Sequence, residues 1–156
     1  MPATTLTVHK AVQNFWENTL AFANKPNSLW FGETALRDKS GQPVELPIAE
    51  IEDGGTEFRW DFLKNPIETT TVTITVRADS LETAEQVMLG ARFNGSAPTA
   101  TAGLDWCQGL SVTNAAVKEV RPLRGSFGKE SYRGKTARLV FWRRMTYSIE
   151  ILRTGA

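Results

Sequence analysis

The sequence predicts an α+β fold, a single domain in which two helices pack on one face of a curved, mainly antiparallel sheet. Residues 69–93 combine a strand pattern and a helix pattern with a clear junction between them. One other segment, residues 8–19, has helical periodicity, and several shorter segments alternate apolar and polar residues between turn-forming stretches. A length of 156 residues, with 41% hydrophobic and 22% charged residues, is typical of one globular domain, here residues 1–156.

The first predicted element is a helix that follows a short tail of residues 1–7. Thr7 can cap this helix, and one side of it then collects six residues: Val8, Ala11, Val12, Phe15, Trp16 and Thr19. The helix is expected to end before Pro26, because proline lacks an N–H and pushes the preceding residue out of the helical region. Residues 29–31 are then expected to form a short strand.

Residues 44–62 are predicted to form two strands joined by a tight hairpin. Pro47 cannot donate to a β-ladder, so the first strand is expected at a sheet edge or a bulge. The Asp-Gly-Gly motif at residues 53–55 is the clearest hairpin signal in the chain. A second alternating run follows and is expected to place its tryptophan in the core: Phe58, Trp60 and Phe62.

A strand at residues 69–77 is the predicted centre of the sheet. Val72, Ile74 and Val76 alternate with polar residues and therefore define its core face. The Asp79 carboxylate is expected to cap a helix that starts near Ser80. The helix has one apolar stripe and is expected to stop at Asn94-Gly95; the stripe is Leu81, Ala84, Val87, Met88 and Ala91.

Two further strands are predicted at residues 110–123 and 136–152. Arg143 lies in the apolar phase of the last strand, so a bulge or bend is expected there. Between the two strands, residues 124–135 are rich in glycine and basic residues, and we expect a projecting loop that folding does not require. Its aromatic residues, Phe127 and Tyr132, are predicted anchors on a neighbouring subunit.

Charge divides the sequence into two parts. Residues 1–116 contain 8 basic and 14 acidic residues, whereas residues 117–156 contain 10 basic and 3 acidic residues. A basic face could bind nucleic acid, or the basic part of one subunit could meet the acidic part of the next in a ring. Folding could also mix the two kinds of charge on one surface.

Catalytic and ligand-binding motifs are weak in this sequence. The glycines at Gly128 and Gly134, with Lys135 and Thr136, miss the spacing of a phosphate-binding loop and lead into a strand. His9 is the only histidine and is expected on the surface, while Cys107 is expected to be an ordinary thiol. We therefore predict no enzyme activity, no cofactor and no metal.

A second group of residues is predicted at subunit contacts. Glu50 and Glu52 share a strand face and are expected to be solvated; with Asp53 they form an acidic patch that basic side chains can approach. Trp142 lies out of phase with the apolar residues of its strand, which favours a subunit contact over burial under a helix. The complete predicted interface comprises Phe127, Tyr132, Arg124, Arg133, Trp142, Arg143, Arg144, Glu50, Glu52 and Asp53.

Most of the chain resembles the tail-terminator, or tail-completion, proteins of long-tailed bacteriophages and prophages. The resemblance rests on the N-terminal helix, LPIAEIEDGG (46–55), TTTVTITVRADSLETAEQVMLGARFNG (69–95) and ARLVFWRRMTYSIEI (137–151). It implies a non-enzymatic subunit that forms a ring, usually a hexamer, which ends the tail tube and meets the head connector. Residues 95–109 and 124–135 depart from the simplest family pattern.

This resemblance implies a location in the virion tail after assembly in the bacterial host cytoplasm. The implied partners are other copies of the chain, tail-tube proteins and head-connector proteins, with transient contact to DNA in the ring lumen. No membrane and no small-molecule substrate is expected, since the sequence lacks a long apolar segment and a signal peptide. The alternatives are another neck or tail-tube component, or a small nucleic-acid-binding module that uses the basic C-terminal third.

Overall fold

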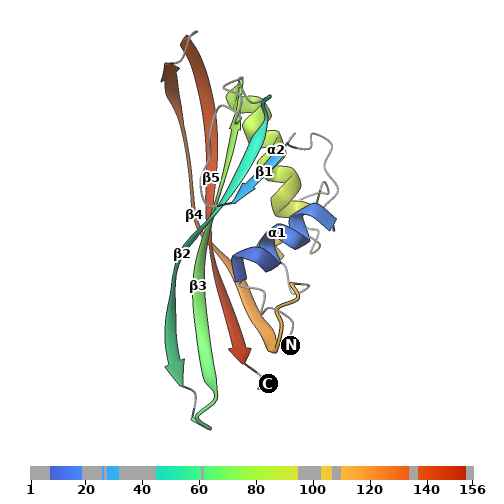
Figure 1. Ribbon diagram of the computed structural model, residues 1–156, viewed down its shortest axis with the longest axis vertical. Helices are drawn as coiled ribbons and strands as arrows, with labels where there is room; N and C mark the ends of the chain where they lie inside the picture. The colour runs from blue at the N-terminus through green and yellow to red at the C-terminus, as the bar shows by residue number, and fades with distance from the viewer. Residues whose placement is uncertain are drawn as a thin grey trace.

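The computed structural model is a long, twisted sheet with both helices on one face (Figure 1). The structure describes residues 8–18, 26, 28–31, 45–60, 62–94, 103–106, 110–133 and 137–153. Its elements are α1 (Val8–Asn18), β1 (Ser28–Phe31), β2 (Ile48–Trp60), β3 (Pro66–Ala78), α2 (Leu81–Phe93), the 3-10 helix η1 (Leu104–Trp106), β4 (Ala115–Arg133) and β5 (Ala137–Arg153).

The strands follow the order β1-β2-β3-β5-β4 across the sheet. The four long strands are antiparallel to one another, and among the strands of the described residues only the short β1 runs parallel to its partner, β2. Two pairs of consecutive strands, β2 with β3 and β4 with β5, form hairpins, and α2 crosses between them in the sequence. The predicted α+β class with two helices on a curved, mainly antiparallel sheet is confirmed.

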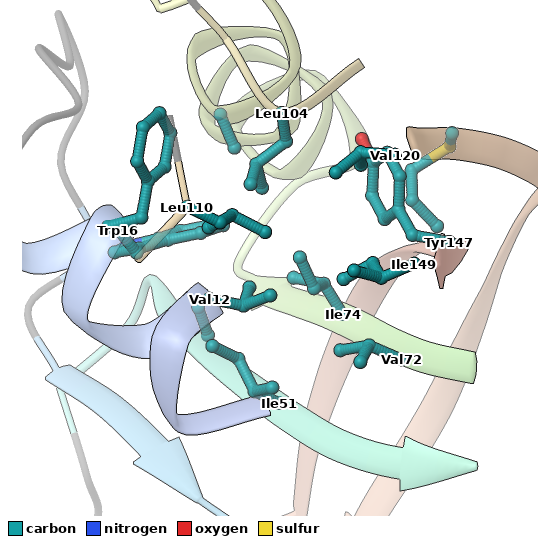
Figure 2. Close-up of a cluster of buried hydrophobic side chains, with 14 of the residues drawn as sticks. Val12, Trp16, Ile51, Val72, Ile74, Leu104, Leu110, Val120, Tyr147 and Ile149 are labelled. Atoms are coloured by element: carbon teal, nitrogen blue, oxygen red, sulfur yellow. The ribbon is translucent and has the colours of Figure 1, made fainter. Parts of the chain in front are cut away.

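The main core lies between the helices and one face of the sheet (Figure 2). Val72, Ile74 and Val76 are fully buried, so the predicted phase of β3 is correct. The remaining strand contribution comes mainly from β5, where Tyr147 and Ile149 are buried. Of the predicted stripes, Leu81 stays partly exposed and Thr19 lies outside the described residues. The other stripe residues are buried: Val8, Ala11, Val12, Phe15, Trp16, Ala84, Val87, Met88 and Ala91.

Helix α2 begins and ends where the sequence predicts, but a different group caps it. The Ser80 hydroxyl accepts a hydrogen bond from the Thr83 backbone N–H at 3.2 Å, so Ser80 is the N-cap and the prediction of an Asp79 cap is wrong. At the other end Asn94 adopts the left-handed conformation, with φ of 55°, and its N–H bonds to the Gly90 carbonyl.

The Asp-Gly-Gly motif at residues 53–55 is a β-bulge, and the hairpin predicted there is wrong. Strand β2 continues through the motif, and its pairing with β3 shifts between Asp53 and Thr56. The Asp53 carboxylate accepts a hydrogen bond from the Gly55 N–H at 2.8 Å, and Gly55 has a φ of 103° that favours glycine. The chain instead turns around residues 62–65, so β2 is 13 residues long.

Residues 124–133 also belong to a long strand and do not form the predicted loop. Strand β4 pairs with β5 from Ala115 to Arg133, and the upper end of this hairpin reaches beyond β3 (Figure 1). Its glycines make room for side chains of β5: a Cβ atom on Gly128 would lie 2.5 Å from Cζ2 of Trp142. The glycines in this segment therefore mark close packing, and the prediction of a loop is wrong. That folding does not require this segment stays a prediction.

The bulge predicted near Arg143 is absent, because β5 pairs with β3 without a register shift from Phe141 to Leu152. The shifts lie in the partner strand β4, next to Val117 and Pro122. Arg143 occupies an apolar phase on the helix-covered face, and its Nε donates to Glu85 of α2 at 2.7 Å. An ion pair with the covering helix thus replaces the predicted bend.

Candidate functional site

The sheet face opposite α1 and α2 contains a network of charged residues. We call it the helix-free face, since neither helix of the described residues lies on it. Arg77 lies between two carboxylates: its Nη1 donates to Glu50 at 2.6 Å and its Nε donates to Glu130 at 2.8 Å. Burial alone would lower the pKa of Arg77, but the hydrogen bonds to Glu130 and Glu50 outweigh this effect and the pKa is raised. The arrangement ties β2, β3 and β4 together.

Glu50 and Glu52 share a strand face, as predicted, but Glu50 is only 4% exposed. The prediction of a solvated carboxylate is therefore wrong for Glu50. Glu52 is exposed, and its pKa is raised, first by a hydrogen bond with Glu50 and second by burial. Within the part of the chain that the structure describes, no group of three His, Cys, Asp or Glu residues could hold a metal ion.

Arg143 and Arg144 point to opposite faces of β5, and each has partners within the subunit. On the helix-free face, Arg144 donates from Nε to the Thr75 hydroxyl at 3.1 Å, and its Cζ lies 4.7 Å from the centre of a Trp142 ring. Trp142 in turn packs over Gly128 in the neighbouring strand. These three predicted interface residues are thus largely engaged within their own subunit.

An open groove lies on the helix-covered side, where the start of α2 approaches β4. It has a volume of about 480 Å³ and is lined by Leu81, Glu82, Glu85, Phe127 and Arg143. Phe127 is 68% exposed, which leaves it available as the anchor that the sequence predicts. We call this feature the α2–β4 groove.

The tip of the β2–β3 hairpin exposes a group of large apolar side chains. Phe58, Trp60, Phe62 and Leu63 are between 69% and 105% exposed, so the prediction of Trp60 as a core residue is wrong. Phe58 and Trp60 pair with Glu68 and Pro66 and point to the helix-covered side of the sheet. The hairpin extends past α1 (Figure 1), so neither helix covers this end, which we call the aromatic tip.

Among the other predicted interface residues, Arg124 is exposed on the helix-free face, and Asp53 belongs to the bulge. Tyr132 and Arg133 are the last two residues of β4, and the structure does not describe their side chains. The sequence signal for the aromatic tip was the alternation of Phe58, Trp60 and Phe62. Alternation alone does not reveal whether a helix covers that face.

The remaining candidates from the sequence either pack within the domain or lie outside the described residues. His9 is largely buried, with Nδ1 3.3 Å from Oδ2 of Asp53, so the prediction of a surface histidine is wrong. Gly134 to Thr136 and Cys107 lie outside the described residues. Strand β4 ends at Arg133 and β5 begins at Ala137, so a strand and not a helix follows the near-match to a phosphate-binding loop.

A buried cluster around Asp105 joins η1 to the rest of the domain. Asp105 accepts hydrogen bonds from Nη2 of Arg92 at 2.7 Å and from the Tyr147 hydroxyl at 2.6 Å. Burial is the main cause that raises the pKa of Tyr147, and the Asp105 carboxylate raises it further. The tyrosine is a neutral hydrogen-bond donor, which suits a structural role in the core.

Comparison with models of known protein families and with curated proteins gives no match. In the described part of the chain, no helix is both long and apolar enough to cross a membrane.

Proposed function

We propose that this protein is a non-enzymatic structural subunit that assembles with copies of itself into a ring, as in a phage or prophage tail. The aromatic tip carries this proposal. A cluster of four large, exposed apolar side chains is uncommon on a monomer and is typical of a surface that another protein covers. In the tail-terminator role, the ring would end the tail tube and meet the head connector.

The two edges of the sheet carry opposite charges, which supports assembly through two different surfaces. Strand β1 pairs only with Ile48 to Ile51, so among the described strands the distal half of β2 has one unpaired edge, with exposed Glu52, Asp53 and Glu57. At the other side of the sheet, β4 is the edge strand and exposes several cations: Lys118, Arg121, Arg124 and Lys129. Opposite charges at the two edges favour head-to-tail contacts, which close into rings when the rotation allows.

The mass of the purified protein in solution tests the proposal. Light scattering across a range of concentrations should give one closed oligomer, and electron microscopy should show rings that cap tail tubes. Apolar contacts should hold the ring together in high salt. A monomer at every concentration, or a ring that does not join tail tubes, would contradict the assembly or the tail role respectively.

A nucleic-acid-binding module is the second candidate, and one observation favours it. Arg121 and Arg124 are exposed on the helix-free face of β4, where they could contact phosphates. Binding to duplex DNA should then weaken steeply with salt and decline in an Arg121→Gln, Arg124→Gln variant. Arg143 and Arg144 are poorer choices for this test, because Arg143 pairs with Glu85 of α2 and Arg144 donates to Thr75 of β3.

A further inference from the structure

We infer that the aromatic tip of one copy docks in the α2–β4 groove of a second copy. This inference rests on the proposed self-assembly and names the two surfaces that meet. The tip protrudes and is apolar, whereas the groove is open and has Leu81 and Phe127 in its lining. A protruding hairpin and an open groove of about 480 Å³ have the complementary shapes that docking needs.

The two surfaces cannot meet within one subunit. The aromatic tip lies at the lower end of the β2–β3 hairpin, and the start of α2 lies near the opposite end of the sheet (Figure 1). Both surfaces also face the helix-covered side, since Phe127 pairs with Arg143 and Trp60 pairs with Pro66 in that phase of the sheet. Every copy therefore offers one tip and one groove, which defines a heterologous contact.

The charges around the two surfaces are complementary. Lys64 is exposed in the turn of the aromatic tip, directly after Leu63. Glu82 is exposed in the lining of the groove, beside Glu85, which already pairs with Arg143. A lysine on the tip can therefore approach a carboxylate at the groove while the apolar side chains are covered.

The apolar area is large enough for a stable contact. Three aromatic side chains bury roughly 450 to 750 Å² when they are fully covered. A stable interface buries about 800 Å² on each partner, so the tip, with Leu63 added, supplies most of one side. The size of this apolar area favours a protein surface over a small ligand as the partner of the tip.

Two variants that each destroy one surface test the inference. Trp60→Ser removes the centre of the tip, and Phe127→Ser removes the apolar wall of the groove. Each should weaken self-association roughly 30-fold or more, as expected for an aromatic residue at the centre of an interface. Leu89→Ser is the matched control, because Leu89 is an exposed residue of α2 that lines neither surface, and it should assemble as the wild type does.

Mixing the two variants gives the decisive result. The Trp60→Ser protein retains its groove and the Phe127→Ser protein retains its tip, so a mixture should form a one-to-one dimer and nothing larger. Separate monomers in the mixture would overturn the inference. Circular dichroism should show that both variants keep the wild-type secondary structure, since both side chains are exposed in the single subunit.

Charge reversal provides a second test that leaves the aromatic residues in place. Lys64→Glu and Glu82→Lys should each weaken association roughly two- to fivefold, and the double variant should recover it. If the wild type forms a ring that none of these variants weakens, the tip and groove are not the contact, although the proposed function stands. A wild type that remains monomeric would overturn both proposals.

Discussion

At the scale of single residues, Asp105 is the acceptor on which two other core groups depend. Its side chain is buried, and it holds both the Arg92 guanidinium and the Tyr147 hydroxyl. Asp105→Ala should lower the free energy of unfolding by about 2 to 3 kcal/mol, because it leaves a partly buried charge without its carboxylate. Urea denaturation measures this loss.

Tyr147→Phe is the matched control for the Asp105 cluster. It removes one hydroxyl but keeps the pair between Arg92 and Asp105, so it should lower the free energy of unfolding by only about 1 kcal/mol. Equal losses in the two variants would show that the arginine contributes little.

His9 should make stability depend on pH. Burial is the main cause that lowers its pKa below 6.5; Asp53 opposes this effect and Lys10 adds to it. The folded state therefore binds the proton less tightly than the unfolded state, so stability is complete above the unfolded pKa and falls as the pH drops below about 6.5. In His9→Gln, the slope of unfolding free energy between about pH 5 and pH 7 should be smaller, and an unchanged slope would contradict the assignment.

At the scale of elements, the Ser80 cap fixes where α2 begins, and with it the position of Leu81 in the α2–β4 groove. Ser80→Ala should lower the free energy of unfolding by about 1 kcal/mol, because the Thr83 N–H loses its acceptor. Ser80→Asp retains a capping oxygen and should restore most of the loss in thermal or urea unfolding. If both variants behave alike, Ser80 does not cap the helix.

Periodicity explains why both helices and the core face of β3 could be predicted. Val72, Ile74 and Val76 define one face whichever strands lie beside them. Glycine was harder to interpret, since it occurs both in turns and where another side chain needs space. Gly55 allows a bulge and Gly128 makes room for Trp142, but the sequence does not show which side chain faces each glycine.

At the scale of the whole molecule, the length of the sheet relative to its helices determines what stays exposed. Phe127 could be predicted as an exposed anchor because glycines and basic residues surround it in the sequence. The aromatic tip could not, because Phe58 and Trp60 alternate like core residues. Their exposure depends on how far along the sheet α1 reaches (Figure 1), and that position is defined only in the folded domain.

The strand order also divides the sheet into two halves that differ in how they form. Each half is a hairpin of consecutive strands, whereas the boundary between β3 and β5 joins residues far apart in sequence, from Ala78 with Phe141 to Ile67 with Leu152. Closing such long loops is entropically unfavourable, so this boundary is expected to form after the hairpins. Side-chain contacts such as the hydrogen bond between Thr73 and Thr146 reinforce it.

The sheet is therefore expected to open first between β3 and β5, while each hairpin stays intact. Amide hydrogen exchange measured by NMR should show that the N–H groups bonded between β3 and β5 exchange as one cooperative set, at a lower free energy than those within either hairpin. Because alternate amides of a strand point to opposite neighbours, the two sets interleave along β5 itself. Uniform exchange along β5 would mean that the sheet opens only by global unfolding. Slow and fast exchange at alternate amides of β5 would mean that the two hairpins are separate folding units that meet between β3 and β5.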